Sequence, residues 1–455
     1  MAVTDHPWGA ASSAKTPVVA GAGGHPWRLG LAGAGAFGRF VLTALAPLPD
    51  VELAGVSARS DVSRAAALAA WRRAREEAGL APGAPDATSD LLELARRADV
   101  DVVLVATPPD LQPQVAQAAV EAGKALFQEK PGALSAERLQ ALAALARERG
   151  VAAGMNFVMR ANPIINCVRR WYQAGLLGLP ERWHVENWAG GELPTDHWFW
   201  DPGRSGGVLI EHGVHFFDEA AWVLGARPLR AWGAGWPHPR RTGLPARAMA
   251  VVEYEGTAAG RPWHLVASFY HGFVRSADEH QVRELGFTAG WLRIDDWIPR
   301  RLTGELRLTP VAVRALEEIA RAELTAFGCD PAVRTGAGVA PRGHDPAGRA
   351  AAEQAGPVNS SGNRTLAGQA PAGPTLLVLP LGDNRVRVDI HLEGGEPLYR
   401  EMVRRGFMQL RRAAAGAGEP LAPLEAGANA LAMAEAARSE SWQDVTTSNR
   451  SSASR

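Results

Sequence analysis

This sequence has few lysines, few cysteines and no net charge. Three of its 48 basic residues are lysines, Lys15, Lys124 and Lys130, and 48 acidic residues bring the formal net charge to zero. A neutral chain is not held to nucleic acid by bulk charge, because that binding grows with clustered basic residues. No run of about 18 or more apolar residues is present, so we expect no membrane-spanning helix and no membrane partner. Since arginine supplies nearly every positive charge, a remaining lysine invites a chemical explanation.

The two cysteines, Cys167 and Cys329, are far apart and match no metal or redox spacing. We therefore expect no disulfide framework and a reducing, cytoplasmic setting. The first 26 residues have no basic start followed by an apolar core, so they are predicted to be a disordered leader rather than a secretory signal. The Ser-rich tail, residues 446–455, is expected to fray.

Residues 27–150 alternate short apolar runs with helical segments, which is typical of βαβ units around a doubly wound parallel sheet. The predicted strands are Arg28–Ala32, Val51–Val56, Val100–Ala106 and Ala125–Gln128. The predicted helices are Phe37–Ala46, Val62–Ala78, Gln112–Ala122 and Ala136–Arg149, the last one capped by Ser135. The sequence thus predicts an N-terminal α/β domain of the Rossmann type.

Residues 151–445 are richer in Trp and have strand-like runs of alternating character. The runs are Trp183–Trp188, Ala248–Tyr254, Trp263–Tyr270 and Val386–Leu392, and a helix is predicted from His212 to Leu224. We expect a C-terminal α+β domain with a large, mostly antiparallel open sheet. Residues 330–373 are rich in Gly, Ala, Pro and Ser without periodicity, which predicts a flexible insertion.

A glycine-rich loop, Gly33–Ala34–Gly35–Ala36–Phe37–Gly38, joins the first predicted strand to the first helix. In this GxGxxG pattern the first glycine permits a tight turn, the second lets the backbone approach a pyrophosphate, and the third allows close helix packing. The helix N-terminus stabilises the anion. The loop predicts a dinucleotide site formed by Gly33, Gly35, Ala36, Phe37 and Gly38, and the alternative is an ordinary strand–helix turn.

The end of the second predicted strand carries no acidic residue for a ribose 2′-hydroxyl. It offers Ser57, Arg59 and Ser60 instead, which are suited to a 2′-phosphate. This favours NADP over NAD as the cofactor, with NAD still possible. The alternative is that Arg59 is a solvated surface residue, and Asp61, one position further, is expected to cap the next helix.

Two more segments follow predicted strands at the carboxyl edge, where ligands of such sheets bind. Thr107 and Pro108 are expected to flank the nicotinamide ribose, although a structural turn would also explain the proline. Glu129 and Lys130 follow the next strand. The lysine ammonium can donate a hydrogen bond to a substrate oxygen, and desolvation can lower the pKa of the ammonium itself. Arginine, in contrast, does not usefully release a proton. The alternative for Lys130 is a surface salt bridge to Glu129.

Four motifs in order resemble the Gfo/Idh/MocA family of NAD(P)-dependent oxidoreductases. They are GAGAFGR at 33–39, VATPPDLQ at 105–112, EKPGALSAE at 129–137 and SGGVLIEHGVHFFDEAAWVLG at 205–225. The resemblance covers most of residues 27–445 except the insertion. It implies a hydride transfer between NAD(P)H and a sugar, polyol or related cyclic compound, and a homo-oligomer, a dimer or tetramer, assembled through the open sheet.

The resemblance also implies roles for individual residues. Lys130 would lie beside the nicotinamide and the reacting carbinol, and Glu129 would belong to the cofactor site. Glu211 and His215, four residues apart on the predicted helix, would bind substrate hydroxyls, with His215 as the general acid/base. The first acid is usually Asp in this family and is Glu here, so the family's substrates do not carry over. Asp218 is expected to be structural or to orient His215.

Other polar and aromatic residues near these motifs leave alternatives open. Arg160 and Asn162 either bind substrate or cofactor groups or pin the domain junction. His212 is expected to face away, and since HExxH is absent we expect no metal site. Four tryptophans either line a substrate pocket bordered by His197 or pack in the core or an interface: Trp183, Trp188, Trp198 and Trp200.

The sequence therefore predicts an enzyme in which Lys130 stabilises an alkoxide while His215 takes its proton. A second hypothesis is a glycoside-cleaving enzyme that uses NAD transiently. A third is a non-catalytic dinucleotide-binding regulator.

Overall fold

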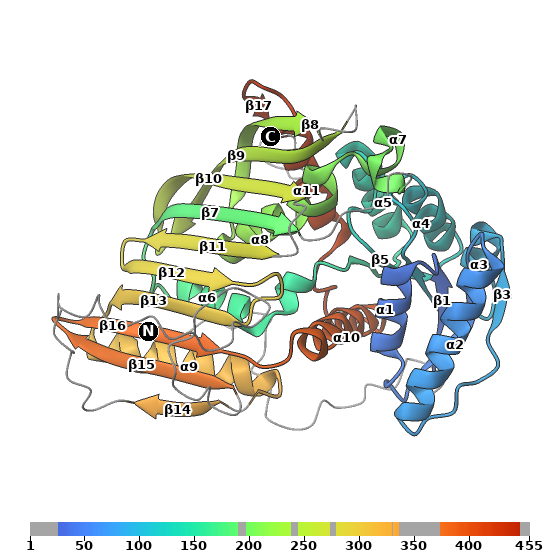
Figure 1. Cartoon of the computed structure of the whole chain (residues 1–455), viewed down its shortest axis with the longest axis horizontal. Helices are drawn as coiled ribbons and strands as arrows, with labels where there is room; N and C mark the ends of the chain where they lie inside the picture. The colour runs from blue at the N-terminus through green and yellow to red at the C-terminus, as the bar shows by residue number, and fades with distance from the viewer. Residues whose placement is uncertain are drawn as a thin grey trace, which may run out of the picture.

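The computed structural model describes residues 26–189, 197–237, 244–273, 279–329, 331–335 and 374–445. The predicted leader except its last residue, Pro26, the predicted tail, and most of the predicted insertion lie outside these ranges. Two sheets, one of six strands and one of eleven, dominate the described residues. Figure 1 shows the small sheet and its helices beside one end of the large sheet.

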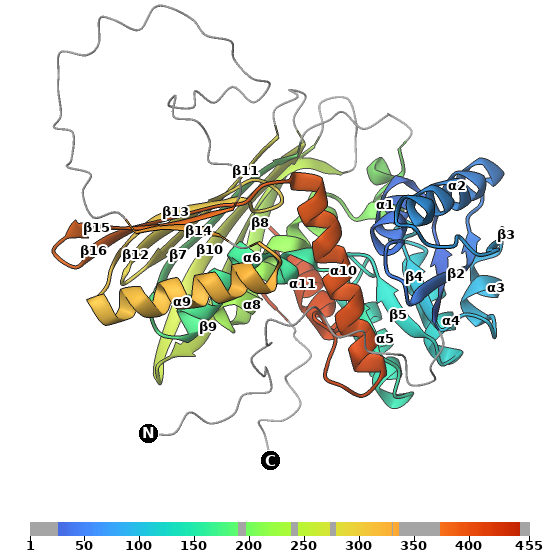
Figure 2. The ribbon, with the colours of Figure 1, turned by 90° about the horizontal axis from the view of Figure 1, so that it is seen from below.

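The small sheet is the predicted Rossmann sheet, with all its pairs parallel and the strand order β3-β2-β1-β4-β5-β6. Its strands are β1 (Trp27–Ala32), β2 (Val51–Ser57), β3 (Asp86–Thr88), β4 (Val102–Val105), β5 (Ala125–Gln128) and β6 (Ala153–Met155). Its helices are α1 (Ala36–Leu45), α2 (Asp61–Glu77), α3 (Leu91–Arg96), α4 (Gln112–Glu121) and α5 (Ala136–Glu148). Figure 2 shows α1 and α2 on one side of this sheet and α3 and α4 on the other. The core strand β4 is wholly buried, as its apolar run predicts.

The predicted end of this domain, Gly150, needs correction. Strand β6 follows it and pairs in parallel with β5. With three residues, β6 is too short to show a periodicity in the sequence, and its place is set by the neighbouring strand. The cap predicted for α5 is present, since the Ser135 hydroxyl accepts from the Arg138 amide at 3.3 Å.

The large sheet has the order β14-β15-β16-β13-β12-β11-β7-β10-β9-β8-β17. Its described pairs are antiparallel except β7 with β10 and β14 with β15. The strands are β7 (Pro180–Ala189), β8 (Arg227–Pro237), β9 (Pro245–Ala258), β10 (Arg261–Phe273), β11 (His280–Phe287), β12 (Gly290–Asp295), β13 (Arg301–Arg307), β14 (Ala332–Thr335), β15 (Thr375–Gly382), β16 (Arg385–His391) and β17 (Gln443–Asp444). Figure 2 shows α6 (Pro163–Gln173), α8 (Val214–Leu224) and α9 (Pro310–Ala326) on one face only.

Two predictions for this domain were wrong in detail. Residues 332–335, inside the predicted flexible insertion, form the edge strand β14, because pairing with β15 supplies an order that composition does not reveal. The helix predicted from His212 begins earlier, as a π-helical turn, η3 (Leu209–Gly213), that runs into α8. Such turns are frequent at functional sites.

The last helices return to the Rossmann domain and fix the two domains together. Helix α10 (Gly395–Ala414) packs on α1, where the Arg400 guanidinium donates to the Thr43 hydroxyl at 2.8 Å and Arg404 donates to the Ala44 carbonyl at 2.7 Å. Helix α11 (Leu424–Ala436) packs on α5 and α8. None of the described helices is long and apolar enough to span a membrane.

Candidate active site

The glycine loop has the geometry that its spacing predicts. Gly33 has φ of +105°, and a Cβ there would lie 2.5 Å from the Ala106 carbonyl carbon. A Cβ on Gly38 would collide with the Gly33 carbonyl oxygen, so helix α1 packs against the loop only with glycine at that position. Gly35 differs: a Cβ there would meet no atom within 4 Å among the described residues. The second glycine therefore borders open space rather than packed protein.

The N-terminus of α1 opens onto the same space. Gly35 is the N-cap residue and provides no side-chain bond to the first turn, and Ala36 and Phe37 are exposed. Two buried hydroxyls lie at the ends of the strands on either side of β1, Ser57 on β2 and Thr107 just after β4, and neither has a hydrogen-bond partner in the described part of the chain. Free amides, a glycine cradle and unpaired hydroxyls fit the pyrophosphate and ribose of a dinucleotide.

The tip of β2 has a mixed character. Arg59 is exposed and has no ion pair among the residues that the structure describes. The Ser60 hydroxyl caps α2 by accepting from the Ser63 amide at 3.4 Å. Asp61, predicted as the cap, is instead the first residue of α2, and its 95 % exposed carboxylate pairs with Arg64. The Ser60 hydroxyl is thus already used to cap the helix, while the Arg59 guanidinium is available to a ligand.

The loops after β4 and β5 are held together by one glutamine. The Gln112 amide donates to the Thr107 carbonyl at 3.0 Å and to the Lys130 carbonyl at 3.3 Å, and its oxygen accepts from the Gly132 amide at 2.8 Å. Gln112 is 2 % exposed. It fixes the backbone of Lys130 relative to the segment expected to flank the nicotinamide ribose.

Lys130 meets the second domain at Glu211. Its Nζ lies 2.7 Å from Oε2 and 2.8 Å from the backbone oxygen of that residue. Glu211 belongs to the π-helical turn η3, and both its carboxylate and its backbone carbonyl accept from the ammonium. The partner of Lys130 is therefore Glu211, and the salt bridge to Glu129 considered as an alternative is not the one formed.

His215 lies in the first turn of α8 and is 5 % exposed. Its ring packs edge-on against Trp297 at 5.2 Å and against Phe157 at 5.8 Å between centroids. Burial lowers the pKa of His215 well below its usual value, and the charge of Lys130 lowers it further. The imidazole is neutral near pH 7 and is able to accept a proton. Its Nδ1 has no partner within the described ranges.

Glu129 lies behind Lys130 and is 4 % exposed. Its carboxylate accepts from the Asn156 amide at 2.5 Å, and burial raises its pKa to about 7. Tyr399, on α10, is near enough for the charge of Glu129 to act on it: the Trp297 indole N–H donates to its hydroxyl, and burial raises the pKa of the phenol. Its ring contacts Phe40 of α1 at 4.8 Å between centroids. Trp297 and Tyr399 are site residues that sequence reasoning missed, because no local motif marks them.

Arg160 and Asn162 lie just after β6, where the chain passes from the Rossmann sheet into the second domain, and Asp218 and their other partners belong to that second domain. Arg160 binds both oxygens of Asp218, at 2.7 and 2.9 Å, and donates to the Leu421 carbonyl. Asp218 is therefore not an orienter for His215. Asn162 is fully buried, caps α6 by accepting from the Ile164 amide at 3.0 Å, and donates to the Pro299 carbonyl. This geometry favours the junction role for both Arg160 and Asn162 over substrate binding.

The predicted tryptophan pocket does not form as one unit. Trp183 is 1 % exposed in the core, and Trp188 packs at a tilt against Tyr270, with 4.7 Å between ring centroids. Trp198 and Trp200 belong to the short 3-10 helix η2 (Trp198–Trp200), which His197 caps. His212 contacts Trp297, at 6.3 Å between centroids, so it does not face away from the site. No cluster of three metal-ligating side chains occurs in the described residues.

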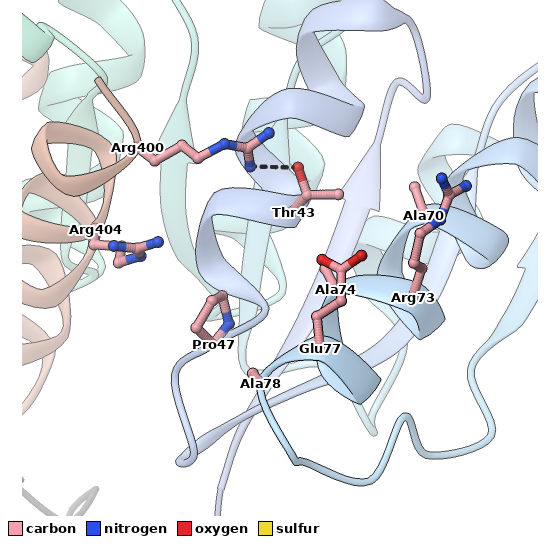
Figure 3. A pocket seen from close by; sticks show the side chains of 9 residues that line it. All are labelled: Thr43, Pro47, Ala70, Arg73, Ala74, Glu77, Ala78, Arg400 and Arg404. Carbon is pink, nitrogen blue, oxygen red and sulfur yellow. Dashed lines mark hydrogen bonds between the residues drawn. The ribbon is translucent and has the colours of Figure 1, made fainter. Parts of the chain in front are cut away.

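A separate pocket lies on the outer side of the Rossmann domain (Figure 3). It has a volume of about 630 Å³ between α1, α2 and α10. Its lining includes Thr43, Arg73, Arg400 and Arg404. The last two arginines already pair with Glu396 and Glu401. Because none of the candidate catalytic groups lines it, this pocket is not the site of the chemistry.

A Rossmann domain joined to an open antiparallel sheet, with its glycine cradle beside Lys130 and His215, defines a two-domain dinucleotide-binding protein. The family model described as "Oxidoreductase family, NAD-binding Rossmann fold" matches residues 27–157, and the "GFO/IDH/MocA C-terminal domain" matches residues 165–290. The chain belongs to the Gfo/Idh/MocA family, as its motifs predict.

Two curated relatives and one solved structure illustrate the similarity. The inositol 2-dehydrogenase of Rhizobium meliloti (strain 1021) is 31 % identical over 44 % of this chain and 56 % of its own length. The scyllo-inositol 2-dehydrogenase (NAD(+)) of Bacillus subtilis (strain 168) is 28 % identical over 38 % of this chain and 51 % of its own length. The chain thus spans about half the length of these relatives.

A levoglucosan dehydrogenase in complex with NADH and L-sorbose has the same fold, with a TM-score of 0.63. It is 16 % identical, and the match covers 93 % of this chain and 100 % of that one.

Proposed function

We propose that the protein is an oxidoreductase that transfers a hydride between NADP(H), or NAD(H), and a secondary alcohol or carbonyl carbon of a sugar, polyol or related cyclic compound. The contact between Lys130 and Glu211, beside the neutral imidazole of His215, carries this proposal. The inositol 2-dehydrogenase relatives support the substrate class.

A bound dinucleotide supplies the hydride chemistry, and Gly33, Gly35, Gly38 and the end of α1 would hold it. Lys130 has three N–H donors and spends two of them on Glu211. The third is available to the substrate oxygen, where the ammonium stabilises the charge of a developing alkoxide.

The proton is handled by His215. In the oxidative direction its neutral imidazole accepts the hydroxyl proton, and in the reductive direction the imidazolium returns it. Glu211 completes the site, because its Oε1 is buried and has no partner among the described residues. That oxygen is suited to accept from a second hydroxyl of the substrate.

We further propose that the cofactor is NADP(H). Exposed Arg59 and the absence of an acid between Ser57 and Ser60 support this, whereas exposed Asp61 is the feature that would favour NAD(H). Titration of the nicotinamide fluorescence with NADPH and NADH, for wild type and Arg59→Ala, tests it. NADPH should bind more tightly, and Arg59→Ala should remove that advantage. Equal affinities in the wild type would contradict the preference for NADP(H), and tighter binding of NADH would favour NAD(H).

The reaction is tested by incubating the protein with NADP⁺ or NAD⁺ and a panel of inositols, anhydrosugars and aldoses. Stoichiometric formation of reduced nicotinamide supports the dehydrogenase. Cleavage of a glycosidic bond with recycled nicotinamide would favour the glycoside-cleaving alternative. Tight dinucleotide binding without turnover of any compound would favour a regulator.

We also propose a homo-oligomer that assembles through the helix-free face of the large sheet, in a reducing, cytoplasmic compartment. Val266 and Trp291 lie exposed on its strands, at 60 % and 46 %. Both cysteines are free thiols, which is compatible with reducing conditions. Light scattering of the wild type and of Trp291→Glu tests the assembly. A monomeric wild type would contradict it.

A further inference from the structure

A row of polar side chains crosses the helix-covered face of the large sheet near one end. His271 of β10, Asn187 of β7 and Gln281 of β11 are register partners on three adjacent strands. They are 0 %, 1 % and 6 % exposed. The next positions on the same face are the apolar Val185 and Phe269 and the buried Arg283, whose charge is paired with Glu219. A polar row in such a setting calls for a ligand or for complete internal pairing.

Internal pairing is incomplete in this row. The Asn187 amide donates to Nδ1 of His271 at 3.1 Å. Since Nδ1 accepts, the neutral imidazole carries its hydrogen on Nε2, and burial keeps it neutral by lowering the pKa of His271 to about 3. Nε2 of His271 and Oδ1 of Asn187 have no partner in the part of the chain that the structure describes. The pair therefore presents one unused donor and one unused acceptor.

The pair lies next to the candidate active site. Asn187 and His271 are each two residues from the end of their strands, and Figure 1 shows these ends pointing toward the Rossmann domain. The Phe216 ring is 5.2 Å from His271 and 5.8 Å from Trp297, which in turn contacts His215.

We propose that Asn187 and His271 determine substrate specificity by binding a hydroxyl of the substrate away from the reacting carbon. This inference rests on the proposed function and names the part of the site that selects the substrate. A hydroxyl is the complement of the pair, because it both donates, to Oδ1 of Asn187, and accepts, from Nε2–H of His271.

The chemistry of the pair also excludes a charged group at this position. A carboxylate or phosphate has no hydrogen for Oδ1 of Asn187 and would place its charge against that oxygen's lone pairs. An ammonium has no acceptor for Nε2–H. We therefore infer that the substrate is a polyhydroxylated ring and that the group it places against this pair is uncharged.

The chain offers a matched control. His184 and Ser268 are register partners on the same two strands, bonded at 2.8 Å, but they project from the opposite face. Changes at this pair alter a histidine and a polar partner on β7 and β10 without approaching the site.

The experiment compares the double variant Asn187→Leu/His271→Phe with His184→Phe/Ser268→Ala. The probes are myo-inositol, levoglucosan and monodeoxy derivatives of whichever compound the wild type oxidises. We expect KM to rise at least tenfold in the first variant and to stay unchanged in the control. For the deoxy derivative that lacks the bound hydroxyl, wild type and first variant should have similar KM values. The melting temperature should hold or rise, since two unpaired buried polar groups are removed.

Every other outcome contradicts either the inference or the proposed function. A lower melting temperature with unchanged KM would make the pair structural and overturn the inference. An equal KM increase for every deoxy derivative would also overturn it, because the pair would then bind no particular hydroxyl of the substrate. A wild type that oxidises no compound would overturn the proposed function, and the inference with it. Should the double variant fail to fold, Asn187→Ser and His271→Gln carry the same comparison.

Discussion

The ammonium of Lys130 lies 2.7 Å from Oε2 of Glu211 and 2.8 Å from the backbone oxygen of the same residue. The two residues are 81 positions apart and come from different domains. The contact closes the junction of the domains at the point where β5 ends, and it fixes the direction of the remaining N–H donor.

Replacing Lys130 with Met should reduce turnover by about 10²–10⁴-fold, because the alkoxide loses its positive partner. The affinity for NADPH should change little, since the glycine loop is untouched. Steady-state rates and fluorescence titration measure the two quantities. Lys124→Met is the control, as it removes another of the three lysines at a position outside the site. Full activity of Lys130→Met would show that this lysine has no catalytic part.

Replacing Gly35 with Ala should leave stability unchanged but weaken dinucleotide binding by about 10-fold or more, since the added methyl enters the space for the pyrophosphate. Gly38→Ala is the contrasting variant. Its Cβ would collide with the Gly33 carbonyl oxygen, so the melting temperature should fall. Melting curves and titration with NADPH separate the two effects. Unimpaired binding in Gly35→Ala would place the pyrophosphate elsewhere.

The buried imidazole of His215 should make stability depend on pH. Its folded pKa lies well below the usual 6.5, so the unfolded chain binds a proton that the folded chain does not. The free energy of unfolding then falls as pH decreases below about 6.5, by at most about 1.4 kcal/mol per pH unit for this group. His215→Gln should flatten that slope. Urea unfolding between about pH 5 and pH 8 measures it, and identical slopes in both proteins would refute the assignment.

Glu129 should act in the opposite direction, because burial raises its pKa from 4.5 to about 7. The folded chain holds a proton that the unfolded chain releases, so this group's contribution is present below about pH 4.5 and is lost as pH rises to about 7. Glu129→Gln keeps the neutral form at every pH. Relative to wild type it should gain up to about 3 kcal/mol between about pH 5 and pH 8. A constant difference across this range would mean that Glu129 titrates normally.

Breaking the junction pair should destabilise the protein. Arg160 and Asp218 are 11 % and 3 % exposed, so Arg160→Met leaves an unpaired buried carboxylate at a cost of about 3–5 kcal/mol. The double variant Arg160→Met/Asp218→Leu should recover much of this loss. Urea unfolding of both variants measures it. If the single variant were as stable as wild type but had a raised KM, Arg160 would be a substrate ligand instead.

Local patterns predicted the parts of the fold and site whose physics is local. The glycine loop is recognisable because its three glycines stand at a fixed spacing within six residues, and the strand around Val103 because both its faces are buried. Features that depend on pairing escaped prediction. The strands β6 and β14 are too short to show a period, and the π-helical turn at Glu211 has no spacing signal of its own.

The sequence by itself determined that a dinucleotide-type loop precedes a retained lysine and a histidine, because those chemistries need particular residues at fixed spacings. Only the tertiary structure decided which groups they meet. In the folded protein Lys130 forms its salt bridge with Glu211 rather than with Glu129, and Asp218 pairs with Arg160 rather than with His215. The tertiary structure also aligned Asn187 with His271 across two strands. Such partners are chosen by strand register and domain packing over 58 to 84 residues, distances at which no sequence period persists.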